Sequence, residues 1–278
     1  MIRSLLYVPA SAERFVAKAH ERGADAIILD LEDAVAPSEK SRARAALVAA
    51  VPAVGRNGAR VFVRINPTED LVLADAEAAC RAGAFGLFVP KTRSPETLRR
   101  LALHLQTIEQ AIGRPETVLV PMLEDPGAVL DARVIVSGPR VFGLIAGGED
   151  LATAMGGEPT PEVLRLPKLL VHMAAKAVGV RSFGLLRSVA DYADTEAITR
   201  SAKEARSFGF DGATCVHPSV VPILNQAFAP SPEDIERARR MIAAAEMAFA
   251  AGKGAFVFEG KMVDEPVVAR ARALLAQR

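Results

Sequence analysis

Short apolar segments alternate with longer segments of helical period along most of the chain. The short segments are hydrophobic without strict alternation, which is typical of strands covered on both faces. Each is followed by a helical pattern, so the sequence predicts an α/β fold, a (β/α)8 TIM barrel. The predicted strands are Ser4–Val8, Ala26–Leu29, Val61–Ile65, Leu87–Val89, Val118–Met122, Val141–Ala146, Val180–Leu185 and Gly212–Val216.

Residues that favour helix ends mark the predicted helices. Thr160 followed by Pro161 is typical of a helix start, and Gly179 is typical of a helix end. The Gly- and Pro-rich stretch before this helix, Gly147–Pro161, is predicted to be a loop. On the helix we expect the following residues to face inward: Leu166, Leu169, Leu170, Met173 and Ala177.

An open, doubly wound sheet is the competing architecture. Such a sheet usually carries a Gly-rich phosphate-binding turn after an early strand, and the sequence has none, so we favour the barrel. We expect the barrel to span residues 1–228 and residues 229–278 to form a C-terminal helical extension, with a long helix after Ser231. The extension packs outside the barrel, covers its mouth or reaches a neighbouring subunit.

Composition excludes several classes of protein. The 278 residues carry a formal net charge of +1, which gives no global field for nucleic acid or an anionic membrane. Apolar segments are too short to span a bilayer, which requires about 20 residues. Two cysteines cannot form a disulfide framework. We expect a soluble, cytoplasmic protein with no nucleic-acid or membrane partner.

Charged and polar residues follow the predicted strands with regularity. In a TIM barrel the carboxyl ends of the strands meet at one rim and carry the active site, so these side chains are expected to converge. In chain order they are Asp30, Glu32, Asp33, Arg64, Asn66, Lys91, Glu124, Asp125, Glu149, Asp150 and His217. The seventh strand ends in apolar residues and contributes no such group.

Glu124 and Asp150 follow adjacent strands and have no His or Cys beside them. Such an oxygen-rich pair favours Mg²⁺, with Mn²⁺ as a substitute. Arg64 is suited to bind a carboxylate or a developing oxyanion. Lys91 contacts a substrate carboxylate or carrier phosphates, or else pairs with Asp30 or Glu124. The alternative for the whole set is a ring of structural ion pairs, but the number of converging groups favours an active site.

Several motifs at these positions resemble one enzyme family. They are Arg3-Ser-Leu-Leu-Tyr-Val-Pro9, Leu29-Asp-Leu-Glu-Asp-Ala-Val35, Val63-Arg-Ile-Asn66, Val89-Pro-Lys91, Gly148-Glu-Asp-Leu151, Val216-His-Pro218 and Gly260-Lys-Met-Val-Asp264. In this order they resemble the HpcH/HpaI aldolase/citrate lyase family, in particular its branch around the citrate lyase beta subunit and the citramalyl- and malyl-CoA lyases.

The resemblance implies an enzyme that cleaves or forms a carbon–carbon bond in a 3-hydroxyacyl thioester carried on coenzyme A or an acyl carrier protein. It implies that Glu124 and Asp150 hold Mg²⁺ and that Arg64 binds the substrate. We expect Glu124 and Lys91 to contact the substrate as well. Asp264 matches a proton-transferring aspartate that a neighbouring subunit supplies, and the family usually forms homotrimers.

A mechanism follows from these roles. Cleavage leaves a thioester enolate, whose charge Arg64 is placed to stabilise, and Asp264 protonates the enolate carbon. We expect Glu32 and Asp33 to hold waters around the metal or to orient Arg64.

Two alternatives to this lyase remain. A metal-dependent aldolase of free 2-keto acids would use a His base near the second strand, where this chain has Asp30-Leu-Glu-Asp33. A noncatalytic subunit that binds an acyl thioester is compatible with two departures from the family pattern. Family members often carry an aspartate at the end of the seventh strand, where this chain reads Ser182-Phe-Gly-Leu-Leu186. They also often have Gly-Lys where this chain has Gly212-Ala213.

Overall fold

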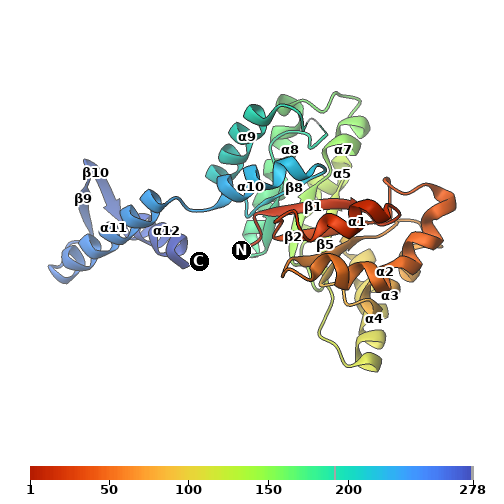
Figure 1. Ribbon diagram of the computed structural model, residues 1–278. Helices are drawn as coiled ribbons and strands as arrows, with labels where there is room; N and C mark the ends of the chain where they lie inside the picture. Colours follow the sequence, from red (N-terminus) through yellow and green to blue (C-terminus); the bar gives the residue numbers. More distant parts are fainter. Residues whose placement is uncertain (191, 277–278) are drawn as a thin grey trace. The chain divides into compact units, whose positions relative to one another are not determined.

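The chain divides into two compact units, which are described separately. The structure is a computed structural model and describes residues 1–190 and 192–276. One unit spans Ile2–Phe228 and the other Ala229–Arg278 (Figure 1). Within the described residues, no helix combines the length and apolar character needed to cross a membrane.

A closed ring of parallel strands forms the first unit. In the described residues the eight-stranded sheet has the order β7-β6-β5-β4-β3-β2-β1-β8, and a parallel bridge between Phe183 and Gly212 joins its two edges. The (β/α)8 barrel predicted from the sequence is therefore confirmed, and the doubly wound sheet is excluded. The strands are β1 (Ser4–Pro9), β2 (Ala26–Asp30), β3 (Arg60–Arg64), β4 (Gly86–Val89), β5 (Val118–Leu123), β6 (Gly143–Ala146), β7 (Arg181–Phe183) and β8 (Ala213–Cys215).

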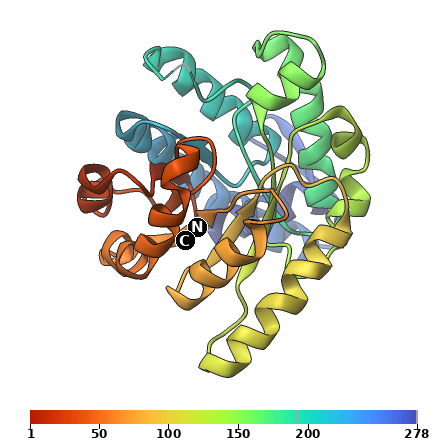
Figure 2. The ribbon, with the colours of Figure 1, turned by 90° about the vertical axis from the view of Figure 1, so that its right-hand side faces the viewer.

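Helices surround these strands (Figure 2). The predicted helix start after Thr160 is present, and the side chains of Thr160 and of Asp194, which precedes α9, each accept a hydrogen bond from a backbone N–H of the first turn. The α-helices are α1 (Glu13–Ala19), α2 (Lys40–Gly55), α3 (Val72–Arg81), α4 (Pro95–Ile112), α5 (Pro126–Leu130), α6 (Ala132–Ile135), α7 (Gly148–Ala154), α8 (Pro161–Ala177), α9 (Thr195–Phe208) and α10 (Val221–Phe228). Short 3₁₀ turns, η1 (Pro37–Glu39) and η2 (Pro218–Val220), precede α2 and α10.

Two expectations about this region are wrong. The stretch Gly147–Pro161 is not only a loop, because it contains helix α7. The inward face of α8 was also misplaced, since Leu166 and Met173 are 66% and 64% exposed. The side chains that α8 buries are Leu164, Lys168, Val171, His172, Ala174 and Ala175. The inward face was predicted from the apolar residues of the helix alone. The face that α8 buries contains Lys168 at its centre, so this criterion missed it.

Side chains fill the barrel interior at the end opposite the strand termini that carry charge. Phe62 and Phe88 pack edge to face, with ring centroids 5.4 Å apart and an interplanar angle of 84°. Phe183 is buried in the same cluster. The interior is thus a packed core, and only its carboxyl-terminal mouth is free for chemistry.

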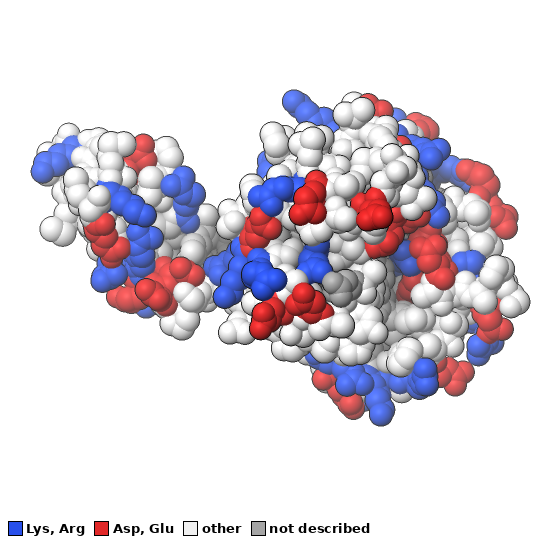
Figure 3. Space-filling model, turned by 90° about the horizontal axis from the view of Figure 1, so that it is seen from above, with Lys and Arg blue, Asp and Glu red and all other residues white. Residues whose placement is uncertain are grey.

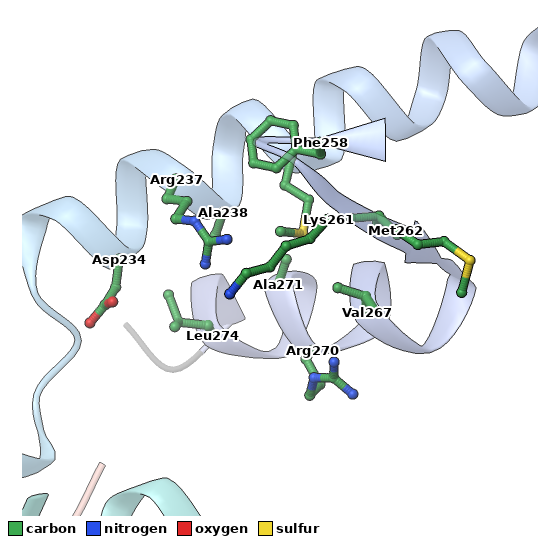
Figure 4. A pocket seen from close by; sticks show the side chains of 12 residues that line it. Asp234, Arg237, Ala238, Phe258, Lys261, Met262, Val267, Arg270, Ala271 and Leu274 are labelled. Carbon is green, nitrogen blue, oxygen red and sulfur yellow. The ribbon is translucent and has the colours of Figure 1, made fainter. Parts of the chain in front are cut away.

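The second unit consists of two helices and a hairpin. Its elements are α11 (Pro232–Ala250), β9 (Ala255–Phe258), β10 (Lys261–Asp264) and α12 (Glu265–Ala276). Ser231 and Asp234 form a reciprocal capping box at the start of α11. Met241, Val263 and Val268 are among the buried residues that join the elements. A cavity of about 370 Å³ lies between the helices and the hairpin, as Figure 4 shows.

Gly212 is one of the points at which the ring of strands tolerates no side chain. A Cβ atom placed there would lie 2.1 Å from the carbonyl oxygen of Ile2. We predict that Gly212→Ala lowers the free energy of unfolding by about 3 kcal/mol, because the backbone of Ile2 and Arg3 or that of Gly212 itself must move. Urea unfolding followed by circular dichroism measures this change. The control is Gly157→Ala, where the added Cβ would lie 3.5 Å from Val163; an equal loss of stability in both variants would contradict the prediction.

Candidate active site

The predicted convergence of strand ends is present. A cavity of about 420 Å³ opens at the carboxyl ends of the barrel strands. Arg64, Glu124 and Asp150, which follow three different strands in the sequence, all line it. Asp30 and Asp33 line the same cavity. Charged side chains of both signs are interspersed on the surface that Figure 3 displays, in keeping with the near-zero net charge.

Arg64 is held by a bidentate pair with Asp30. The Nε and Nη2 atoms of Arg64 donate to the two carboxylate oxygens of Asp30 at 2.7 and 2.6 Å. Nη1 lies 3.1 Å from both Glu32 and Asp33. Burial lowers the pKa of Arg64, but the hydrogen bonds and charge of Asp30 outweigh this and raise the pKa above its usual value. The prediction that Glu32 and Asp33 orient Arg64 names two of its neighbours but omits the principal one, Asp30.

Tyr7 forms the floor beneath this arginine. The guanidinium carbon of Arg64 lies 5.1 Å from the centroid of the Tyr7 ring, in cation–π contact. Tyr7 lines the cavity, although the sequence analysis assigned it no role. The ring and Asp30 together fix the plane of the guanidinium, so Arg64 presents a preset direction to the cavity.

Glu124 is a buried carboxyl group at the end of β5. Its Oε2 accepts a hydrogen bond from the backbone N–H of Lys91 at 2.8 Å. Lys91 has a φ of +51°, a left-handed conformation that is uncommon for residues other than glycine. On the other side a Cβ on Gly147 would lie 2.7 Å from Oε1, so a side chain there would displace the Glu124 carboxyl group from this position. Burial raises the pKa of Glu124 to about 8, and the charges of Glu32 and Asp150 add to the rise.

The carboxylates around Glu124 are short of cations. Asp150, in the first turn of α7, shares the cavity with Glu124. Both carboxylate oxygens of the buried Glu32 accept no well-formed hydrogen bond from the described residues. Lys91 Nζ and Arg64 Nη1 reach these oxygens only as ion pairs, at 3.2 and 3.1 Å. Buried acceptors without hydrogens to accept require water or a cation beside them.

These observations fit a divalent metal ion. The described residues contain no cluster of three or more His, Cys, Asp or Glu arranged to hold one. Glu124 and Asp150 alone would supply two oxygen ligands, which suits Mg²⁺, an ion that keeps several waters. Glu32, with its unsatisfied oxygens, is placed to accept hydrogen bonds from such waters.

Three other predicted residues have neighbours as follows, and only the pairing of Lys91 differs from the expected one. The side chain of Lys91 pairs with Glu32, and not with Asp30 or Glu124; only its backbone reaches Glu124. Asp264 ends strand β10 of the C-terminal unit. His217 contacts its own loop, with Nδ1 2.7 Å from the hydroxyl oxygen of Ser219.

The fold and the cavity together define a TIM-barrel enzyme with an oxygen-rich site suited to a hard metal ion and an adjacent oriented arginine. The family model of the HpcH/HpaI aldolase/citrate lyase family matches residues 3–218. The chain therefore belongs to that family of enzymes, and the resemblance seen in the sequence motifs is confirmed.

Curated relatives match almost the whole chain. A (3S)-malyl-CoA thioesterase of Cereibacter sphaeroides is 36% identical over 278 residues, which cover 99% of this chain and 94% of that protein. A citrate lyase subunit beta of Escherichia coli is 31% identical over 281 residues, covering 99% of this chain and 92% of that protein.

Solved structures agree with this assignment. The protein CitE from Mycobacterium tuberculosis, in complex with magnesium, acetoacetate and coenzyme A, has a TM-score of 0.81 and 31% identity. The match covers 99% of this chain and 97% of that one. A citrate lyase beta subunit from M. tuberculosis complexed with oxaloacetate and magnesium has a TM-score of 0.69 and 29% identity, and covers 82% of this chain and 97% of that one.

The raised pKa of Glu124 predicts a specific dependence of stability on pH. Because the pKa rises from 4.5 to about 8 on folding, the folded state holds this proton more tightly than the unfolded chain. Its contribution to stability is full below pH 4.5 and is lost as the pH rises through about 8. We predict that Glu124→Gln, without metal, gains stability relative to wild type between pH 5 and 9, by on the order of 3 kcal/mol.

Urea unfolding in EDTA at the two pH values measures this difference. The exposed Glu158 supplies the control, since Glu158→Gln should show the same pH dependence as wild type. A constant difference between Glu124→Gln and wild type across this range would show that Glu124 titrates normally.

Proposed function

We propose that this protein is a Mg²⁺-dependent carbon–carbon lyase. It would cleave a 3-hydroxyacyl thioester such as citramalyl-CoA, malyl-CoA or a citryl group on a carrier into an acetyl thioester and a 2-oxo acid. In the reverse direction it would form the 3-hydroxyacyl thioester from these two compounds. The observation that carries the proposal is the cavity in which Glu124 and Asp150 lie with the oriented Arg64. The magnesium, oxaloacetate and coenzyme A bound by related structures support it.

Glu124 and Asp150 would hold Mg²⁺, which when bound polarises the oxygen that becomes the ketone or aldehyde. The protein side chains supply the rest. In carbon–carbon cleavage the 3-hydroxyl group would lose its proton to solvent as the carbonyl group forms and the bond between the second and third acyl carbons breaks. The electron pair of that bond remains on the carbon next to the thioester, and its charge spreads to the thioester oxygen. Arg64, held in place by Asp30 before substrate arrives, would stabilise that oxygen without reorganisation.

The enolate carbon must then gain a proton. Asp264 is our candidate for the acid, on the resemblance of Gly260-Lys-Met-Val-Asp264 to the family motif. In the condensation direction its carboxylate would remove the same proton. We propose that a second copy supplies Asp264, so the active enzyme would be an oligomer, with the homotrimer as our expectation. An acyl carrier protein as partner and a cytoplasmic location complete the proposal.

Thioester hydrolysis is a second candidate, because a 36% identical relative bears the name (3S)-malyl-CoA thioesterase. Hydrolysis and carbon–carbon cleavage would use the same bound acyl thioester. They differ in the bond that breaks: the carbon–sulfur bond in one, the bond between the second and third acyl carbons in the other.

A single assay separates the two reactions. Purified protein with Mg²⁺ is given malyl-CoA or citramalyl-CoA, and acetyl-CoA, 2-oxo acid and free thiol are measured together. We expect acetyl-CoA and glyoxylate or pyruvate in equal amounts, no free thiol, and loss of turnover in EDTA. Free coenzyme A with malate or citramalate would instead identify a thioesterase. Absence of turnover with coenzyme A esters and with carrier-bound substrates would favour the noncatalytic subunit.

Removal of the carboxylate of Asp264 tests the proton-transfer step. We predict that Asp264→Asn lowers kcat at least about a hundredfold, the usual range for loss of a general acid or base, and changes KM little. Glu246→Gln is the control, because Glu246 is exposed on α11 of the same unit. Turnover by Asp264→Asn at the wild-type rate would remove Asp264 from the mechanism.

A further inference from the structure

Lys168 is a buried cation in the wall of the active-site cavity. It belongs to the face of α8 that packs against the barrel, and it is only 5% exposed. Its Nζ donates hydrogen bonds to the backbone carbonyls of Leu185 and Arg187, at 2.9 and 2.7 Å. Lys168 and Leu185 both line the cavity that contains Glu124. The lysine thus anchors the chain that leaves β7 and also contributes to the cavity wall.

No carboxylate neutralises this ammonium. Among the described residues none forms an ion pair with Lys168, whereas the other cations of the site each have acidic partners. Arg64 pairs with Asp30 and Lys91 pairs with Glu32. The segment after β7 reads Gly184-Leu185-Leu186 and brings no acid to this position. Glu149 attracts the ammonium electrostatically but forms no ion pair with it in the described residues, and its carboxylate accepts a hydrogen bond from Ser188.

A buried, unneutralised ammonium is costly to a folded protein unless an anion joins it. Burial lowers the pKa of Lys168 to about 8, against the opposing attraction of Glu149, so its proton is held weakly in the free protein. Two carbonyl dipoles occupy two of its three N–H groups. One donor and most of the charge therefore remain available to a ligand.

Two glycines at the start of α7 line the same cavity as Lys168, namely Gly147 and Gly148. A Cβ placed on Gly148 would lie 3.0 Å from Leu164 and 3.3 Å from Nζ of Lys168. Glycine at this position therefore lets the backbone of α7 pack closely against α8 and the ammonium.

We propose that Lys168 binds the carboxylate of the 2-oxo acid portion of the substrate. The inference rests on the proposed function and assigns a recognition group to it. The metal site formed by Glu124 and Asp150 and the cation Lys168 are then two attachment points for the acid. Arg64 remains free for the charge that develops on the thioester. Uncharged acyl groups would lack the second attachment and be rejected.

Direct binding of a 2-oxo acid tests the proposal without any turnover. The titrant is pyruvate, and isothermal titration calorimetry follows its binding to the full-length protein with Mg²⁺. We expect Lys168→Met to raise the Kd for pyruvate by at least about tenfold, since a hydrogen bond to a charged group is lost. Lys168→Arg, which keeps the charge, should restore affinity to within about threefold of wild type.

Lys176→Met is the matched control, with the same substitution on the same helix. Lys176 pairs with the half-exposed Asp211 at 2.6 Å and does not line the cavity, so its loss should leave pyruvate binding unchanged. Circular dichroism and thermal unfolding verify that each variant is folded. If Lys168→Met does not fold, Lys168→Gln replaces it under the same criterion.

Three results would overturn the proposal. They are unchanged pyruvate affinity in Lys168→Met, equal loss in Lys168→Met and Lys168→Arg, and failure of wild type to bind pyruvate, glyoxylate or oxaloacetate. The outcome is independent of the lyase reaction. Lys168-dependent binding of pyruvate without thioester turnover would reject the proposed lyase and leave the anion site in place.

Discussion

The burial of several carboxylates around one cavity is the constraint that shapes this site. Glu32 and Glu124 are 4% and 5% exposed, and Asp30 is 2% exposed. Arg64 is shared among the three carboxylates at and just after the end of β2, and Lys91 pairs with one of them, Glu32. Arg64 satisfies Asp30 fully and Glu32 only in part, while Glu124 keeps a raised pKa. The site therefore has more negative than positive charge and favours the binding of a further cation. Burial of these carboxylates lowers the stability of the folded protein when no such cation is bound.

The barrel could be predicted from the sequence because its determinants are local. Each strand is a short apolar run, and charged residues at the strand ends share one rim whatever the details of packing. This sufficed to bring Arg64, Glu124 and Asp150 into one cavity. Partners depend on side-chain direction, which the pattern does not contain. The sequence therefore did not indicate that Lys91 pairs with Glu32, or that Asp30 is the main partner of Arg64.

Helix α8 shows why hydrophobicity alone misses functional residues. The buried face of the helix has the regular helical spacing of Leu164, Lys168, Val171 and Ala175. Because one of these residues is a lysine, the face does not stand out as apolar in the sequence. Leu166 and Met173 make a more apolar face that the structure leaves exposed. A charged residue on an otherwise small and apolar helical face is a sequence feature that could have revealed Lys168. Such a conflict between local pattern and burial is typical of places where function overrides stability, which is why Lys168 is a candidate for a functional residue.

The two candidate reactions, carbon–carbon cleavage and thioester hydrolysis, require different groups in the active site. Both begin with an acyl thioester, so the cation site and Arg64 serve either one. Carbon–carbon cleavage releases a 2-oxo acid that must be held until it leaves or reacts in reverse. Hydrolysis releases no such acid and needs an attacking water beside the thioester carbonyl. A buried ammonium reserved for a carboxylate is useful to both reactions in the ground state. In the lyase it would retain the 2-oxo acid and in the thioesterase the hydroxy acid, so the products released, and not the anion site, distinguish the two reactions.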